Sequence, residues 1–476
     1  MIIPDDDNPS VRKDDGSAQQ HASPAIPESA AVLEREEPAG RRFVRAFLVA
    51  VAIWVLAGIF VSSTIDTHRS IHWVWSPRNA VKGFPDNPTI EDGNIDSCVP
   101  WTSVPGREHP RLPLAASGSW SRASVDLPAY ADALYLIARG ALASGNLYVS
   151  ESRATENVSV TVFVNRRGAE ALSRASVCRL SRKGGEAGVG VFAPRKRHIP
   201  WPLPGGGLRF VVQVELPTRG DAVRYVPSFR VDMPLFAMTM GNLSAFRFGD
   251  VALKSSNSPV AVERVVANAL TIRAMNGAIK GNFNTTDSLT IVTTNGPVSV
   301  RVGAENGGSE KSTNVLIQTS NALVLSLKSL FDLLSNPLRL IEADISLTSK
   351  SSSGTGGTFN IRTHTSNGPI NIVYDDSPVD SILNFDAQST NAPVGVTLHQ
   401  AYEGAFSLET TNSKAVLDRS RHVEDPSGQG RGRMVTTNSV KTQFVNGKIA
   451  WFPSSRDRRA GSVDIGTTNA FVKLSI

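Results

Sequence analysis

The sequence predicts a mainly β protein in which a single transmembrane helix is followed by an antiparallel β-domain and a β-solenoid-like repeat domain. Three observations lead to this fold class. Residues 46–65, AFLVAVAIWVLAGIFVSSTI, carry no charge; segments from residue 126 onward alternate apolar and polar residues; and an asparagine-centred phrase recurs through residues 236–476. A β-sandwich of irregular hairpins is the alternative for the repeat region.

The N-terminal 65 residues divide into a tail and a membrane span. Residues 1–40 are acidic, rich in proline and without apolar periodicity, which predicts a disordered cytosolic tail. Residues 41–65 are predicted to form the transmembrane helix with its basic flank, since about 20 residues at 1.5 Å each span the hydrocarbon core of a bilayer. Arg41, Arg42 and Arg45 precede the span, so the positive-inside rule places the N-terminus in the cytosol. We therefore expect a single-pass type II membrane protein.

The alternatives for this span fit less well. A buried core helix would need a polar face, which residues 46–61 lack, and a cleaved signal peptide would begin nearer the N-terminus. The predicted topology leaves the C-terminal region lumenal or extracellular.

Three glycosylation sequons and two cysteines follow the span. The sequons begin at Asn157, Asn242 and Asn284, which fits a glycoprotein with its C-terminal region outside the cytosol. Cys98 and Cys178 are the only cysteines of the chain. They could form one disulfide in an oxidising compartment, and neither belongs to a metal-spaced set.

Two regions connect the span to the repeats. Residues 66–125 contain four tryptophans among many prolines and hold no long periodicity, which predicts a stalk. Residues 126–235 contain ALYLIARG, GNLYVS, VSVTVFV and GLRFVVQVELP, which alternate apolar and polar residues between Gly, Asn and Pro and predict an antiparallel β-domain.

Residues 236–476 form the asparagine-centred β-repeat domain. The phrase varies from SSNSPVAV through TTNGPVSV to TTNAFVKL, and apolar residues recur six and four positions before the asparagine and three and five positions after it. Each unit therefore reads as strand, corner, strand, and the 46-residue gap after the fourth asparagine suggests two coils with one degenerate centre. The predicted repeat corners are Asn257, Asn276, Asn295, Asn321, Asn367, Asn391, Asn412, Asn438 and Asn469.

A corner explains the phrase better than a two-residue hairpin. A type I′ hairpin needs positive φ at both turn residues, whereas the second position is often Ser or Ala, and proline frequently follows. Asparagine tolerates the left-handed conformation, and stacked coils would align the asparagines and preceding threonines into ladders. At Asn438 the flanking apolar positions hold Gly432, Lys441 and Gln443, which predicts a distorted or edge unit.

Several phrases resemble a known family. The T-[TS]-N-G-P-[IV]-x-[IV] units, with ARGALASGNLYV, CRLSRKGGEAGVGVF and LHQAYEGAFSLETTNS, resemble uncharacterised membrane-anchored proteins of basidiomycete fungi, whose repeats are similar to those of the bacterial putative-adhesin domain. The resemblance covers about residues 40–476, with YEGAF its most specific part. It implies a cell-surface or secretory-pathway β-repeat ectodomain and brings no catalytic residues to this chain.

The sequence shows little sign of chemistry. Asp375, Asp376 and Asp380 cluster among turn residues, which favours a solvated loop, and His364 and His399 have no metal ligands at a suitable spacing. No nucleophile or nucleotide-binding motif is present. We expect no enzyme activity, no cofactor and no metal. The chain also lacks the dense basic stripe that nucleic-acid binding requires, so no nucleic-acid partner is expected.

Two functions from different classes remain. The favoured one is a non-catalytic adhesin-like or structural surface protein, in which the ladder-rich face or the loops 303–312 and 351–357 contact a surface protein or a cell-wall glycan. The repeat region holds only Trp451, Tyr374 and Tyr402 as Trp or Tyr residues, and this scarcity favours protein contact. The alternative is a carbohydrate-active β-helix enzyme, which requires carboxylates converging across adjacent coils.

Overall fold

The computed structural model describes residues 88–104, 119–154, 156–166, 172–173, 175–194, 208–218, 220, 222–307, 311–321, 341–419, 423–453 and 460–476. All of them belong to one compact unit, Val81–Ile476. The predicted tail, the predicted transmembrane helix and parts of the predicted stalk lie outside the described residues. Within the described residues, no helix is long and apolar enough to cross a membrane.

The unit is mainly β, as predicted, and its strands join one hydrogen-bonded network. A short 3-10 helix, η1 (Ile90–Asp92), precedes the strands. The strands of the N-terminal part are β1 (Asn94–Val99), β2 (Thr102–Val104), β3 (Ser119–Leu127), β4 (Ala133–Arg139), β5 (Gly145–Ser152), β6 (Val158–Arg166), β7 (Ser176–Arg182), β8 (Glu186–Phe192), β9 (Arg209–Pro217), β10 (Arg224–Asp232) and β11 (Phe236–Asn242).

The strands of the repeat region follow. They are β12 (Phe246–Lys254), β13 (Val260–Ala274), β14 (Ile279–Thr293), β15 (Val298–Asn306), β16 (Thr313–Thr319), β17 (Ile341–Ser349), β18 (Thr358–Thr365), β19 (Ile370–Asp376), β20 (Ile382–Ser389), β21 (Val394–Thr397), β22 (Gly404–Thr410), β23 (Ala415–Asp418), β24 (Gly432–Lys441), β25 (Phe444–Phe452), β26 (Gly461–Thr467) and β27 (Val472–Ser475).

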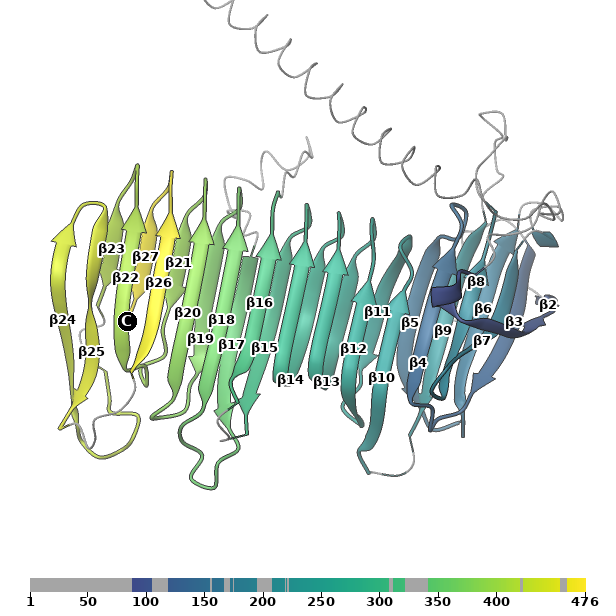
Figure 1. The fold of residues 1–476 in the computed structure, drawn as a ribbon, viewed down its shortest axis with the longest axis horizontal. Helices are drawn as coiled ribbons and strands as arrows, with labels where there is room; N and C mark the ends of the chain where they lie inside the picture. Colours follow the sequence, from purple (N-terminus) through teal and green to yellow (C-terminus); the bar gives the residue numbers. More distant parts are fainter. Residues whose placement is uncertain are drawn as a thin grey trace, which may run out of the picture. The chain divides into compact units, whose positions relative to one another are not determined.

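The repeat strands pair in parallel in two series, which overlap in the view of Figure 1 and share one core. Series A runs β10–β12–β13–β14–β16–β18–β20–β26–β22. Series B runs β5–β11–β13–β14–β15–β17–β19–β21–β27–β23. The long strands β13 and β14 contribute their first halves to series B and their second halves to series A. Each repeat therefore adds one strand to each series.

The apolar offsets of the sequence set this register. The residues six positions before the corners pair directly in series A, and those three positions after them pair in series B, with Ile341 in place of the predicted Val324. These side chains are buried in one continuous core, where each fully buried Val, Leu, Ile or Phe stabilises the fold by about 1.5–3 kcal/mol. The aligned core residues of series A are Val251, Leu270, Leu289, Val315, Ile361, Phe385, Val463 and Phe406.

The 46-residue gap between Asn321 and Asn367 is one repeat and not two. Strand β16, before Asn321, pairs directly with β18, before Asn367, and the two asparagine side chains are hydrogen-bonded to each other. Residues 322–340 lie between the corner and β17. The sequence-based expectation of a second, degenerate coil is therefore wrong, because the gap is an insertion at one corner.

The N-terminal strands continue the same core. Antiparallel pairs join β2–β3–β6–β9 and β1–β7–β8, whereas β4 and β5 pair in parallel with β8 and β9 on one side and with β10 and β11 on the other. The predicted domain boundary at residues 235/236 is thus not a break in the core. The predicted stalk also contains strands, since β1, β2 and the start of β3 fall within residues 66–125.

The C-terminal repeats do not stack in chain order. Strands β26 and β27 lie between the β20–β21 repeat and the β22–β23 repeat, so the last repeat of the sequence is the last but one in space. Beyond β22, the hairpin β24–β25 adds antiparallel strands, with β25 against β22 and β24 outermost (Figure 1).

Candidate functional site

The corner asparagines form a ladder of side-chain amides. In six pairs of neighbouring repeats, Nδ2 of one corner asparagine donates to Oδ1 of the other, and the amides thereby connect those repeats. The six bonds, donor first, are Asn276–Asn257, Asn295–Asn276, Asn367–Asn321, Asn391–Asn367, Asn469–Asn391 and Asn412–Asn469, with N···O distances of 2.5–2.7 Å. The backbone N–H of Asn295 donates to the Met275 carbonyl, and other corners repeat this bond.

At the corners other than Asn276, where Ala274 takes the position, the residue two positions before the asparagine is a buried serine or threonine whose hydroxyl binds backbone. Thr293 Oγ1 accepts the Gly296 N–H at 3.1 Å within its own corner and donates to the Gly277 carbonyl of the preceding corner at 3.4 Å. Thr467 similarly donates to the Ala392 carbonyl at 3.0 Å. The hydroxyl residues do align from repeat to repeat as predicted, with Thr293 opposite Thr319 and Thr365 opposite Ser389. They do not pair with one another, because backbone carbonyls take the hydroxyl protons.

Two further expectations about the corners are corrected. Among the described residues other than glycine, Asp380 alone has positive φ, so the corner asparagines do not use the left-handed conformation. Glycine after the asparagine allows neighbouring corners to stack closely, since a Cβ on Gly296 would lie 2.0 Å from the Gly277 carbonyl oxygen. Asn438 is not a corner: it occupies a bulge within β24, where the register shifts between Thr437 and Ser439.

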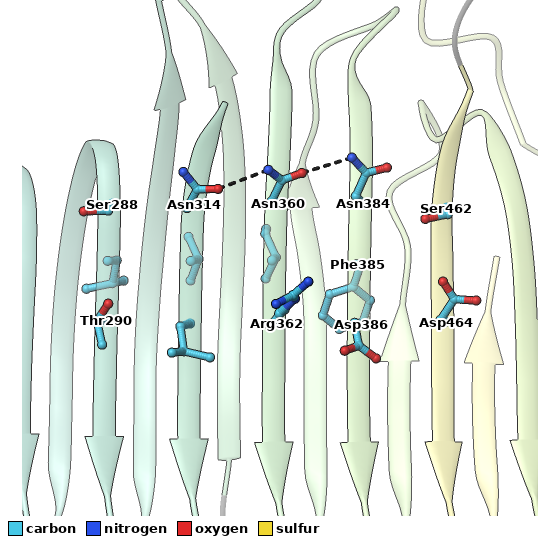
Figure 2. A pocket seen from close by; sticks show the side chains of 14 residues that line it. Ser288, Thr290, Asn314, Asn360, Arg362, Asn384, Phe385, Asp386, Ser462 and Asp464 are labelled. Carbon is cyan, nitrogen blue, oxygen red and sulfur yellow. Dashed lines mark hydrogen bonds between the residues drawn. The ribbon is translucent and has the colours of Figure 1, made fainter. Parts of the chain in front are cut away.

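An open groove of about 720 Å³ lies on the outer face of series A, across β14, β16, β18, β20 and β26. We call it the ladder groove. Its floor carries a second row of amides, in which Asn384 Nδ2 donates to Asn360 Oδ1 at 3.0 Å and Asn360 Nδ2 to Asn314 Oδ1 at 3.1 Å (Figure 2). The polar lining residues are Ser288, Thr290, Asn314, Asn360, Arg362, Asn384, Asp386, Ser462 and Asp464.

Charged groups lie in register beside the amides. Arg362, Asp386 and Asp464 occupy the same position on β18, β20 and β26. Partial burial raises the pKa of Asp464, and the charge of Asp386 raises it further. Gln388 Nε2 donates to Asp386 at 3.0 Å, whereas Arg362 is exposed and makes no hydrogen bond or ion pair with any described residue. The groove thus offers an unpaired cation, two carboxylates and a row of amides.

The three aspartates that cluster in the sequence lie at the end of a strand and in the following turn. Asp375 and Asp376 are exposed at the end of β19, and Asp380 lies in the turn that follows. His399 Nδ1 accepts the Ala401 N–H at 3.2 Å, and burial lowers the pKa of this imidazole. His364 is exposed on β18. Within the described part of the chain, no three His, Cys, Asp or Glu side chains gather as metal ligands.

The remaining sequence-predicted positions are spread over the molecule. Asn157 and Asn242 are exposed, and Asn284 lies half-buried within β14. Cys98 and Cys178 face each other on β1 and β7 and are joined by a disulfide.

The predicted contact loops bond to themselves or belong partly to a strand, and the aromatic residues of the repeat region are buried. In the loop 351–357, Ser351 Oγ donates to the Thr355 carbonyl at 2.6 Å, so its hydroxyl groups fold back on the loop itself. Much of 303–312 is not loop, because β15 continues to Asn306. Trp451, Tyr374 and Tyr402 are buried, at 1%, 3% and 4% exposure, and cannot stack a ligand.

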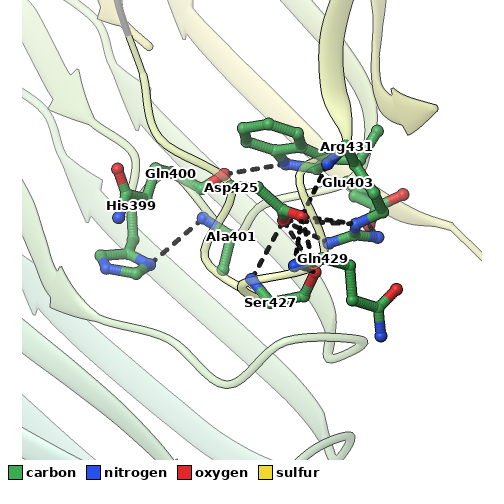
Figure 3. A network of polar contacts seen from close by, with 9 residues as sticks. His399, Gln400, Ala401, Glu403, Asp425, Ser427, Gln429 and Arg431 are labelled. Atoms are coloured by element: carbon green, nitrogen blue, oxygen red, sulfur yellow. Dashed lines mark hydrogen bonds and ion pairs between the residues drawn. The ribbon is translucent and has the colours of Figure 1, made fainter. Parts of the chain in front are cut away.

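A second polar network holds the C-terminal hairpin. The Asp425 carboxylate accepts hydrogen bonds from the backbone N–H groups of Ser427, Gln429 and Arg431 and from the Arg431 guanidinium (Figure 3). Arg431 also pairs with Glu403 at 3.3 Å and lies over the Trp451 ring. The Arg431 guanidinium, assisted by the backbone donors, holds the pKa of Asp425 well below its ordinary value. This network fixes the loop that leads into β24.

Comparison with known proteins gives limited information. No family model and no curated protein matches the chain. Similar solved structures include a putative adhesin from Bacteroides fragilis, at 10% identity over 58% of this chain and 96% of that chain, with a TM-score of 0.30. Another is a putative adhesin from Parabacteroides merdae, at 10% identity over 58% of this chain and 90% of that chain, with a TM-score of 0.27.

A putative cell adhesion protein from Clostridium sporogenes is also similar, at 4% identity over 74% of this chain and 98% of that chain, with a TM-score of 0.16. These scores are too low for the function of the bacterial proteins to be transferred to this chain. The resemblance to fungal membrane-anchored proteins stays a prediction.

Proposed function

We propose that this chain is a membrane-anchored, non-catalytic surface protein whose β-repeat region is a β-solenoid that contacts a partner through its outer face. The ladder groove carries the proposal. It presents Arg362, which has no partner among the described residues, beside amides and carboxylates that repeat from strand to strand. A surface that repeats in this way suits a partner with its own repeated polar groups, such as a cell-wall glycan, or the polar surface of another protein.

The winding of the two series supports the proposed solenoid. Each repeat contributes one strand to each series and buries its apolar side chains between them, so neighbouring repeats stabilise one another. An outer face that is free of core packing can then vary without loss of the fold. The ladder groove lies on such a face.

The disulfide supports a lumenal or extracellular placement. Disulfides persist in oxidising compartments, and the one between Cys98 and Cys178 lies on the same side of the predicted span as the three sequons. The topology is tested by expressing the full-length chain, replacing Asn157, Asn242 and Asn284 singly by Gln, and measuring glycosidase-sensitive mobility together with protease access on intact cells. Absence of sugar with a protected C-terminal region would reverse the proposed topology.

The contact function is tested by adhesion of cells that express the full-length chain to immobilised cell-wall glycan and to untransfected cells. Arg362→Gln should reduce adhesion several-fold, because it removes the cation that the ladder groove offers to a partner. The fold should be unaffected, since the exposed guanidinium makes no hydrogen bond or ion pair with any described residue. Arg122→Gln, at an exposed position on β3, is the matched control and should leave adhesion unchanged. Equal adhesion by cells with and without the chain would contradict the proposal.

A carbohydrate-active enzyme is the second candidate, and one observation favours it. Asp386 and Asp464 are carboxyl groups in register on adjacent strands, and the raised pKa of Asp464 suits a general acid. Release of reducing ends from a polysaccharide panel by the purified full-length chain would support this function. Activity that survives both Asp386→Asn and Asp464→Asn would exclude this site.

A further inference from the structure

An exposed tyrosine lies flat on the outer face beside the N-terminal end of the repeats. Tyr225 of β10 is 61% exposed and is in register with Arg247 of β12. Its hydroxyl lies over Gly249, where a Cβ would be 2.6 Å from Tyr225 Oη and 2.4 Å from the Pro227 carbonyl oxygen. Gly249 therefore leaves the space that the tyrosine side chain occupies, and the ring remains open to solvent.

Two arginines, neither with a side-chain partner among the described residues, lie further along this surface. Arg247 and Arg264 are both exposed, and neither side chain makes a hydrogen bond or ion pair with any described residue. Arg264 pairs with Asn242 of β11, whereas Arg247 precedes Phe248, which pairs with Ala267 further along β13. Other cations nearby are engaged: Arg230 pairs with Asp250 at 3.4 Å, and Arg224 donates to the Pro217 carbonyl at 2.5 Å.

Both arginines line an open groove of about 520 Å³ that runs on over β13, β14, β15 and β17. We call it the arginine groove. Next along it come the amides of Asn282 and Asn284, and then Arg301, whose pairing with Asp344 at 3.5 Å leaves it 75% exposed. The end beside Tyr225 is thus cationic and aromatic, and the far end carries the acids Asp344 and Asp375.

We propose that Tyr225, Arg247 and Arg264 bind a polysaccharide that bears carboxylate groups, such as a polymer of uronic acids. The tyrosine ring stacks a sugar ring, and the two guanidinium groups take successive carboxylates through paired N–H···O bonds. The amide of Asn282 can then exchange hydrogen bonds with sugar hydroxyls. The proposal rests on the proposed function in one respect, that this face is turned toward the compartment holding the ligand.

An acidic peptide fits the groove less well. The strands beneath it are hydrogen-bonded to neighbours on both sides, so an extended peptide has no free strand edge with which to pair. Of the residues that line the groove, only Val266, Val302 and Gly303 lack a polar side chain, which offers little to an apolar anchoring side chain. A sugar polymer needs neither, since it is recognised through ring faces, hydroxyls and carboxylates.

The test is equilibrium binding of the purified full-length chain to polygalacturonate, with dextran as the neutral polymer and poly-L-glutamate as the acidic peptide. We expect binding to polygalacturonate that weakens with salt and no binding to dextran. Arg247→Gln and Arg264→Gln should each weaken binding about tenfold, the loss expected for one charge-assisted contact. Tyr225→Ala should weaken it as well, and Tyr225→Phe should retain it because the ring is kept.

The controls separate this inference from the proposed function. Arg362→Gln, in the ladder groove, should leave polygalacturonate binding unchanged, whatever its effect on adhesion. Loss of polygalacturonate binding in Arg362→Gln would move the site to the ladder groove and overturn the proposal. So would unchanged binding in Arg247→Gln, or no binding by the unaltered chain. Poly-L-glutamate binding that depends on the arginines but not on Tyr225 would assign the groove to an acidic protein instead.

Discussion

Single buried hydroxyl groups join one repeat to the next. Thr293 is enclosed at a corner, where it satisfies a backbone N–H of its own turn and contacts a carbonyl of the preceding turn. Ser255, Thr319, Thr365, Ser389, Thr410 and Thr467 occupy equivalent buried positions. A buried backbone group without a partner is costly, which explains why a hydroxyl and not a methyl group is used there.

Replacing Thr293 by valine should show this cost. Thr293→Val keeps the shape but leaves the Gly296 N–H without an acceptor, so we expect the free energy of unfolding to fall by about 1–3 kcal/mol. Thr293→Ser retains the hydroxyl and is the matched control, with a smaller loss from the missing methyl group. Thermal and denaturant unfolding measure both. Equal losses in the two variants would show that packing matters more than the hydrogen bond.

The raised pKa of Asp464 predicts how the stability of the fold depends on pH. Its folded pKa is raised above the ordinary value of 3.8 by partial burial and by Asp386, so the ionised carboxylate destabilises the fold. The penalty is present above the folded pKa and disappears as the pH falls through it. Asp464→Asn should therefore raise the melting temperature at pH 7 and not at pH 3, with a gain of at most about 0.5 kcal/mol because solvent screens the pair.

Much of the residue-level pattern was predictable from the sequence. The offsets identified the buried face of each strand, since only one register places Leu270, Leu289 and Val315 together. The role of asparagine was only half predictable. Its amide ladder follows from stacking, but its backbone conformation depends on the corner geometry, which the sequence does not specify. Tyr225 and Arg247 could not be paired before the register of β10 and β12 was known.

At the level of elements, the β24–β25 hairpin covers the open edge of β22. Its own outer strand, β24, has a free edge that could pair with other chains, and two features oppose this. The exposed Lys441 places a cation near its end, and the bulge at Asn438 interrupts its backbone. The Asp425 network fixes the loop before it, so the hairpin is held by its entry as well as by pairing with β22.

Breaking the Asp425 network should loosen the hairpin selectively. Asp425→Ala removes the acceptor of three backbone N–H groups and of Arg431, whose side chain is only 7% exposed. We expect faster amide exchange in β24 and β25, and unchanged exchange in β13 and β14. Asp418→Ala, which removes an exposed ion pair with Lys473, is the control and should change little. Uniform acceleration across all strands would contradict a local role.

The spatial order of the C-terminal repeats could not be predicted from the sequence. Short corners fix neighbouring repeats, because the chain has no length with which to skip one. The chain passes over one place in the stack between β21 and β22, through residues 398–403, and β26 and β27 fill that place after the β24–β25 hairpin. No local pattern in Asn412 or Asn469 distinguishes their order.

At the scale of the whole unit, the last repeat acts as a shared neighbour. Ile465 is buried in register between Ala387 of β20 and Leu408 of β22, so the repeat supports strands on both sides. In a stacked array, stability comes from each repeat and from its contacts with its neighbours. Loss of this repeat therefore removes two interfaces and separates the end of the array from the rest.

Truncation after residue 453 tests this arrangement. The shortened chain lacks β26 and β27, and the β22–β23 repeat and its hairpin would have to shift by about one strand spacing, 4.8 Å, to meet β20 and β21. The corner amide of Asn412 would also lose its partner, Asn469. We expect β22 to β25 to lose protection from amide exchange while β12 to β18 retain it.

A point variant makes the same test in the full-length chain. Ile465→Ala should lower the stability of the C-terminal repeats by about 2–5 kcal/mol, because it leaves a cavity between two interfaces. Lys473→Ala, on the outer face of β27, is the control and should have little effect. If protection were lost in β22 alone, with β20 unaffected, the last repeat would support only one side. If it were lost from β12 to β22 together, the array would unfold as a single unit, and its repeats could not be treated as separable neighbours.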